Sequence, residues 1–165
     1  MRNQANLNVR THEAMASSDW VKWGFLAAAA SIIAVLVVQA LATSIWPEIA
    51  LFGPLDNYFR SAIFTLVPTV VATALFAWLA GHTARPVRAF IVISVVVLLI
   101  SFIPDYAVPV PYKTILASTV AAFLHVVAAV ATVSLLVIGI NDESKGKTAP
   151  NHHQSNQKYR QPRGN

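Results

Sequence analysis

The chain alternates between long runs of apolar residues and short polar segments. Runs without Asp, Glu or Lys cover four stretches, at about residues 24–45, 61–80, 87–103 and 115–140. At a rise of about 1.5 Å per residue, the last run would form a helix of about 39 Å, which exceeds a hydrocarbon core of about 30 Å. The pattern therefore predicts an all-α fold, an up-and-down bundle of four transmembrane helices.

The polar segments between the runs are rich in residues that end helices. Segments 47–60 and 104–113 contain two and three prolines, and both are interpreted as loops. Gly81 is suited to end one helix and Pro86 to begin the next, which predicts a tight turn at 81–88. The chain is therefore divided into a flexible cytoplasmic arm, a transmembrane domain and a disordered basic tail, at residues 1–19, 20–140 and 141–165.

Charged residues make up 12% of the chain, against about a quarter in soluble globular proteins. The flanks that include both termini and the 81–88 turn hold ten Lys and Arg residues, whereas the opposite flanks hold Arg60 and Lys113. By the positive-inside rule, both termini are cytoplasmic in a multi-pass plasma-membrane protein. Arg85 and Arg88 are expected to contact anionic lipid headgroups. The basic residues indicate a lipid surface, and no nucleic-acid motif is present.

An alternative interpretation treats the first apolar run as a signal peptide, because Ala40-Leu41-Ala42 fits a small-x-small cleavage pattern. Cleavage would leave three spans. The run is longer than the apolar region of a signal peptide, about 15 residues at most, and a long polar arm precedes it. Retention of the run is therefore favoured, with Trp20 and Trp23 at the membrane interface.

His125 lies near the middle of the last apolar run and is the main candidate for a functional residue inside the membrane. Small or polar residues recur every seven positions around it, at Ser118, Thr132 and Gly139. Small residues allow helix backbones to approach closely, and hydroxyl groups form hydrogen bonds across helices. This stripe is therefore predicted to be the packing seam.

Polar residues of other runs are expected to meet His125. Counted at about 1.5 Å per residue from the ends opposite the 81–88 turn, Thr69, Thr73 and Ser94 lie at its depth. Because burial disfavours the charged form, His125 is expected to be neutral and bonded to one of these hydroxyl groups.

Gln39 is expected to lie level with Pro68. A proline inside a helix leaves one carbonyl without its usual donor, here that of Phe64, and the Gln39 amide could donate to it. The candidate intramembrane polar site therefore consists of His125, Gln39, Thr69, Thr73 and Ser94.

The predicted spans contain no Asp, Glu or Lys that could form a proton path with His125. The favoured function is therefore a non-enzymatic structural or accessory interaction protein. The alternative is a small oligomeric transporter or proton-coupled permease that uses His125 and Gln39. An intramembrane enzyme would need pairs of nucleophile and base, which these spans lack.

No cofactor or metal is expected. The chain has no cysteine, and haem ligation by two histidines needs two imidazoles at one depth, whereas His82 lies in the 81–88 turn. His152 and His153 are adjacent in the tail but lack further ligands.

The polar loops offer two opposite-charge pairs, Asp56 with Arg60 and Asp105 with Lys113, which are interpreted as ordinary surface ion pairs. The expected partners are the lipid bilayer, with its anionic headgroups, and either further copies of the chain or a larger membrane complex.

The run PTVVATALFAWLAGHTARPVRAFIVISVVVLLISFIP, with its T-A-R-P-x-R turn at Thr83–Arg88, is followed by the HVVAAV of the last span. These pieces resemble a family of small four-helix integral membrane proteins, mainly actinobacterial, that share a domain of unknown function. The resemblance covers about residues 22–140. It implies a bacterial plasma-membrane protein and carries over no catalytic residue, because the family has no assigned activity.

Overall fold

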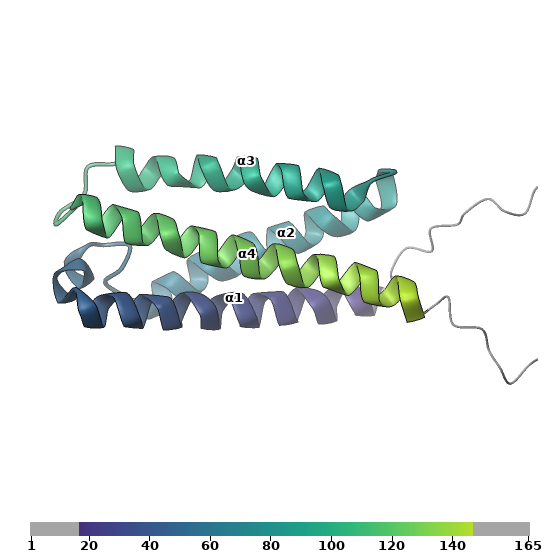
Figure 1. The fold of residues 1–165 in the computed structure, drawn as a ribbon, viewed down its shortest axis with the longest axis horizontal. Coiled ribbons are helices and arrows are strands. Elements are labelled where there is room, and N and C mark those ends of the chain that lie inside the picture. The colour runs from purple at the N-terminus through teal and green to yellow at the C-terminus, as the bar shows by residue number, and fades with distance from the viewer. Residues whose placement is uncertain (1–16, 147–165) are drawn as a thin grey trace, which may run out of the picture.

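The computed structural model describes residues 17–146. Most of the predicted arm and tail, including His152 and His153, therefore lies outside the described residues. Over the described range the chain forms four long α-helices and one short 3-10 helix (Figure 1). In chain order these are α1 (Ser17–Ile45), η1 (Pro47–Leu51), α2 (Tyr58–His82), α3 (Pro86–Ala107) and α4 (Ile115–Gly146).

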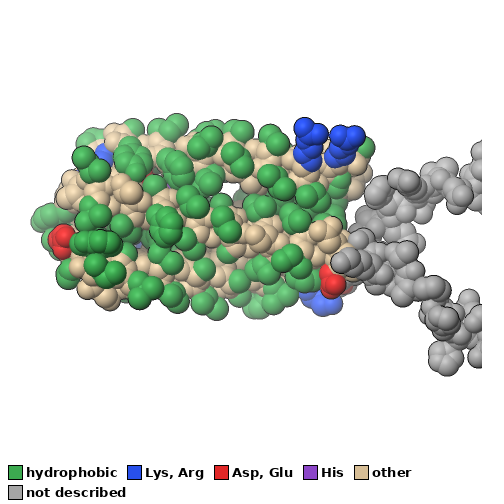
Figure 2. Space-filling view, in the orientation of Figure 1, with side chains coloured by type: hydrophobic (Ala, Val, Ile, Leu, Met, Phe, Trp, Pro, Cys, Tyr) green, Lys and Arg blue, Asp and Glu red, His purple; other side chains and the backbone are tan. Residues whose placement is uncertain are grey.

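Each of the four long helices in residues 17–146 is long and apolar enough to cross a membrane. This confirms the prediction of an all-helical protein with four candidate spans. On the face shown in Figure 2, hydrophobic side chains cover the length of the bundle, and charged side chains gather toward its two ends. The surface is therefore apolar where lipid would surround it.

Consecutive helices run in opposite directions (Figure 1). α1 packs extensively against α2 and α4, and α3 packs against α4 and, less extensively, against α2. The end of the bundle that holds η1 and the α3–α4 loop is called the η1 end. The opposite end, with the α2–α3 turn and the ends of the described chain, is called the terminal end.

Local sequence explains where α2 and α3 begin. The Asn57 side chain accepts hydrogen bonds from the backbone N–H groups of Phe59 and Arg60, which satisfies two donors at the start of α2. Pro86 opens α3, as predicted, where a missing N–H has no consequence for the helix.

Two predicted boundaries are wrong. α3 was expected to end at residue 103, but it continues through Pro104 to Ala107. The helix stops there because the next residue, Val108, precedes Pro109 and has an extended backbone. α4 was expected to end at residue 140, but it continues to Gly146, so the first six residues of the predicted disordered tail are helical.

Two hydrophobic clusters hold the helices together. At the η1 end, Ile49, Phe52 and Leu55 fold back onto α1 and α4 and are almost fully buried. At the terminal end, Phe76 stacks on Phe90 with ring centroids 4.3 Å apart, and Trp20 meets Phe76 edge-on at 5.5 Å.

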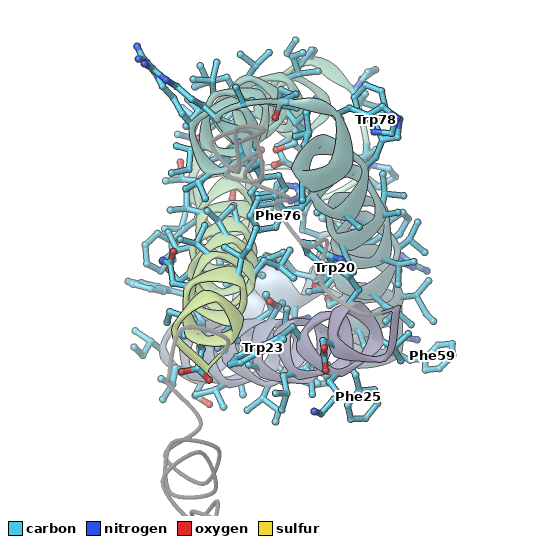
Figure 3. All side chains as sticks on the ribbon, turned by 90° about the vertical axis from the view of Figure 1, so that its right-hand side faces the viewer. Trp20, Trp23, Phe25, Phe59, Phe76 and Trp78 are labelled. Carbon is cyan, nitrogen blue, oxygen red and sulfur yellow. The ribbon has the colours of Figure 1, made fainter. Side chains whose placement is uncertain are left out.

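The two tryptophans at the start of α1 are partly buried and pack against the cluster at the terminal end. The rings of Trp20 and Trp23 point between the helices, whereas Phe25, Phe59 and Trp78 point outwards (Figure 3). Trp23 lies so close to α4 that a Cβ added to Gly139 would come within 2.5 Å of its ring. Gly139 of the predicted seam is therefore a site of close helix approach.

Candidate functional site

The imidazole of His125 pairs with a carboxylate from the neighbouring helix. His125 Nε2 of α4 lies 3.3 Å from Oδ2 of Asp105, near the end of α3. Asp105 was expected to lie in a surface loop and to pair with Lys113. That expectation is wrong: Lys113 Nζ instead donates to the backbone carbonyls of Tyr106 and Val108. The other predicted loop pair, Asp56 with Arg60, is present at 2.9 Å.

Helix direction explains why Asp105 and His125 meet. Side chains in an α-helix lean toward its N-terminus. α3 begins at the terminal end and α4 at the η1 end, so the Asp105 side chain leans away from the η1 end and His125 leans toward it. The Asp105 backbone carbonyl points the other way and accepts a hydrogen bond of 2.7 Å from Ser118 Oγ. Asp105 therefore contacts two residues of the predicted packing seam, His125 through its side chain and Ser118 through its backbone carbonyl.

The two members of the pair differ in burial. The Asp105 side chain is 8% exposed, whereas 42% of the His125 side chain remains exposed. The contact has the distance of an ion pair without hydrogen-bond geometry, and Oδ2 has no hydrogen-bond partner among the described residues. A buried carboxylate oxygen without a donor is costly, and it is a strong acceptor for any group that reaches it.

Both residues line a cavity of about 870 Å³ between α2, α3 and α4. Its walls are mostly apolar, and Phe90, Leu75 and Val133 line it toward the terminal end. Behind these lies the aromatic cluster of Phe76 and Trp20. The titratable side chains among the described lining residues are Arg60 on α2, Asp105 on α3 and His125 on α4.

A second polar feature is a chain of hydroxyl groups that joins α1, α4 and α2. Thr132 Oγ1 lies 2.8 Å from Ser31 Oγ and 3.1 Å from Thr69 Oγ1, and all three residues are buried. The Thr69 hydroxyl donates to the Thr65 carbonyl at 2.8 Å. Since a hydroxyl carries one hydrogen, Thr132 must donate to Thr69 and Ser31 to Thr132.

The residues that were predicted to form one polar site therefore do not all meet. Thr69 meets Thr132, and the Thr73 hydroxyl donates to the Thr69 carbonyl while its methyl group packs on Gly24 of α1. Thr69 and Ser94 line the cavity with His125, but the residue paired with His125 is Asp105.

Gln39 is fully buried, but its amide does not donate to the carbonyl that Pro68 leaves without its usual donor. Its Nε2 donates to the Leu55 carbonyl at 3.0 Å, so it ties the segment after η1 to α1. Gln39 Oε1 is buried without a hydrogen-bond partner among the described residues. Gln39 is not among the residues that line the cavity. The expected contact with the Phe64 carbonyl is therefore wrong.

One feature of the sequence could have revealed Asp105. The third predicted span, with 17 residues, was shorter than the roughly 20 that a span requires. An extension by four residues through Pro104 supplies the missing length and moves Asp105 from the loop into the helix.

Comparison of the chain with protein-family models, curated proteins and solved structures gives no match.

Proposed function

We propose that this protein is a non-enzymatic multi-pass membrane protein that binds and carries a small molecule, with Asp105 and His125 as the polar centre of its cavity. The observation that carries the proposal is the Asp105 oxygen, buried beside an imidazole and without a donor, in the wall of a cavity of about 870 Å³. Ionisable groups inside a bundle are costly, and they commonly mark substrate or ion pathways. The volume falls within the range of about 300–1,000 Å³ typical of ligand pockets.

The preference for a purely structural protein depended on the absence of a second titratable group near His125. Asp105 supplies that group. A carboxylate and an imidazole within 3.3 Å can share or exchange a proton, which is the chemistry that a proton-coupled permease requires.

The proposed setting is the plasma membrane, with the terminal end in the cytoplasm. The excess of Lys and Arg in the segments at that end supports this orientation. Arg85 and Arg88 are exposed there, at the start of α3, and are suited to anionic headgroups. The same setting follows from the resemblance to the actinobacterial family.

A second candidate function, as an accessory subunit or homo-oligomer, is favoured by the exposure of α3. Within α3, all of which is described, only Phe90 and Asp105 are buried. Its outward side chains, such as Leu99 and Ile103, are 59% and 60% exposed. Native mass spectrometry from membrane-derived particles would detect a partner on this face.

The proposed function is tested by nitrogen NMR of the His125 imidazole in lipid nanodiscs, with the signal assigned from a His125→Gln variant. We expect the ring signal to be broadened by a water-soluble paramagnetic probe, because 42% of the His125 side chain is exposed, and its nitrogen shifts to change in Asp105→Asn, because the carboxylate lies 3.3 Å from Nε2. A ring that is shielded from water and whose signal is the same in Asp105→Asn would contradict the proposal and support a structural role.

A further inference from the structure

The ionisable side chains that line the cavity are gathered toward one end of it. Arg60, Asp105 and His125 lie toward the η1 end, whereas the part toward the terminal end is lined by Phe90, Leu75 and similar apolar residues. A ligand that matches this lining carries one polar group at one end of an apolar body.

The cavity also has a lateral opening. Some of its lining residues are themselves largely exposed on the outside of the bundle: Phe64 and Val71 of α2 are 68% and 61% exposed, and Val97 of α3 is 56% exposed. α2 and α3 diverge toward the η1 end (Figure 1). The space between them therefore faces the lipid beside the half of the cavity that holds Asp105.

The polar group of such a ligand is determined by which ionisable side chain of the cavity still lacks a hydrogen-bond partner. Arg60 is already engaged, with Asp56 Oδ1 at 2.9 Å and the Gly53 carbonyl at 2.6 Å. Asp105 Oδ2 has no donor among the described residues. A protonated amine would supply both a positive charge and N–H donors to this oxygen, whereas an anionic group would be repelled by it.

We propose that the cavity binds an amphiphilic amine, which reaches it from the lipid between α2 and α3 and places its ammonium group on Asp105. This inference rests on the proposed function and names its ligand class. The apolar body of the amine lies along α2, α3 and α4 toward Phe90, and the imidazole of His125 is displaced from Asp105 or shares it with the ammonium group.

The probe is dodecylamine, added to the full chain in nanodiscs of phosphatidylcholine. Binding is followed through the NMR signal of His125 as the mole fraction of amine in the bilayer rises. Ethylamine, which has the same polar group without the apolar body, and dodecyl sulfate, which has the same body with an anionic group, are tested in parallel. We expect a saturable response to dodecylamine alone.

Three variants locate the binding. Asp105→Asn keeps the shape of the side chain without its charge and is expected to weaken binding about tenfold or more. Ala129→Phe fills the cavity from α4, and its matched control Val130→Phe adds the same ring at a position 59% exposed and outside the cavity lining. Loss of binding in Ala129→Phe with retention in Val130→Phe is expected.

The route is tested by Val97→Trp, which narrows the opening between α2 and α3, with Val96→Trp as a control outside the cavity lining. Slower exchange of dodecylamine in Val97→Trp alone supports access from the lipid. Equal exchange in both variants overturns that route.

The results separate this inference from the proposed function. Equal responses to ethylamine, or to dodecyl sulfate, would overturn the amphiphilic amine while leaving the cavity as a binding site. A response that persists unchanged in Asp105→Asn would show a hydrophobic probe without a specific polar contact, and it would overturn the inference. If no probe binds, the inference fails, and the water access of His125 and its response to Asp105→Asn decide the proposed function independently.

Discussion

At Asp105, near the end of α3, a carboxylate is buried within the helical bundle. The group is 8% exposed and faces an imidazole that is 42% exposed. Removing one member of a buried pair leaves the other uncompensated, and this penalty is usually larger than the net contribution of the pair. Substitutions of the two residues should therefore be strongly non-additive.

His125→Leu is expected to lower the free energy of unfolding in detergent by about 0.6 kcal/mol or more, because Asp105 loses its neighbour. In a cycle with Asp105→Leu, the coupling energy is expected to be about 0.5–3 kcal/mol. The measurement is denaturant-induced unfolding of the wild type, both single variants and the double variant.

The exposed pair of Asp56 and Arg60 is the control for this cycle, with an expected coupling of about 0–1 kcal/mol. Additive effects of the two substitutions at Asp105 and His125 would show that the observed proximity contributes nothing to stability.

The hydroxyl of Thr132 connects three helices, because it accepts a hydrogen bond from Ser31 of α1 and donates one to Thr69 of α2. Thr132→Val preserves shape and removes both hydrogen bonds, so a loss of about 0.6–1.7 kcal/mol is expected. Thr119→Val on the same helix, at an exposed hydroxyl, should cost less. Thermal unfolding of both variants makes the comparison, and equal losses would argue against the buried chain.

At the scale of the helices, the close contact between α1 and α4 depends on a missing side chain. Gly139→Ala would place a Cβ within 2.5 Å of the Trp23 ring, so the helices would have to separate. Such overpacking is expected to destabilise the bundle by about 1–3 kcal/mol.

Gly81→Ala is the matched control for Gly139→Ala, because no atom lies within 4 Å of the added Cβ. Alanine favours a helix by about 1 kcal/mol over glycine, so this variant is expected to be neutral or stabilising. Unfolding curves that rank the two variants in the opposite order would refute the packing at Gly139.

The helices could be predicted from the sequence because a membrane span needs a long apolar run whose length depends on the bilayer. The pairing of their side chains could not, because it depends on how far each helix is shifted along its neighbour. Thr69 and Thr132 lie about 17 and 25 Å from the η1 ends of α2 and α4, yet they are in contact. A depth count that begins all helices at one level therefore placed Thr69 beside His125.

At the scale of the whole molecule, the absence of cysteine makes the orientation directly measurable. Single cysteines are introduced as Ala50→Cys, exposed in η1, and Ala84→Cys, exposed in the α2–α3 turn. On intact cells, a membrane-impermeant maleimide is expected to label Ala50→Cys and to leave Ala84→Cys unlabelled until the cells are opened.

Labelling in the reverse pattern would invert the proposed orientation, and labelling of both sites on intact cells would contradict the placement of the two ends on opposite sides. Lysed cells provide the control, since both cysteines should then react.

The stacked rings of Phe76 and Phe90 have a consequence for any carrier built on this fold. They close the cavity toward the terminal end. A ligand that enters beside Asp105 can therefore leave in that direction only after the rings have separated. Stacking of two aromatic rings adds about 0.5–1.5 kcal/mol beyond the area they bury. From stacking alone, the separated arrangement would be about tenfold less populated at most. The two rings would then control how often the cavity opens toward the terminal end.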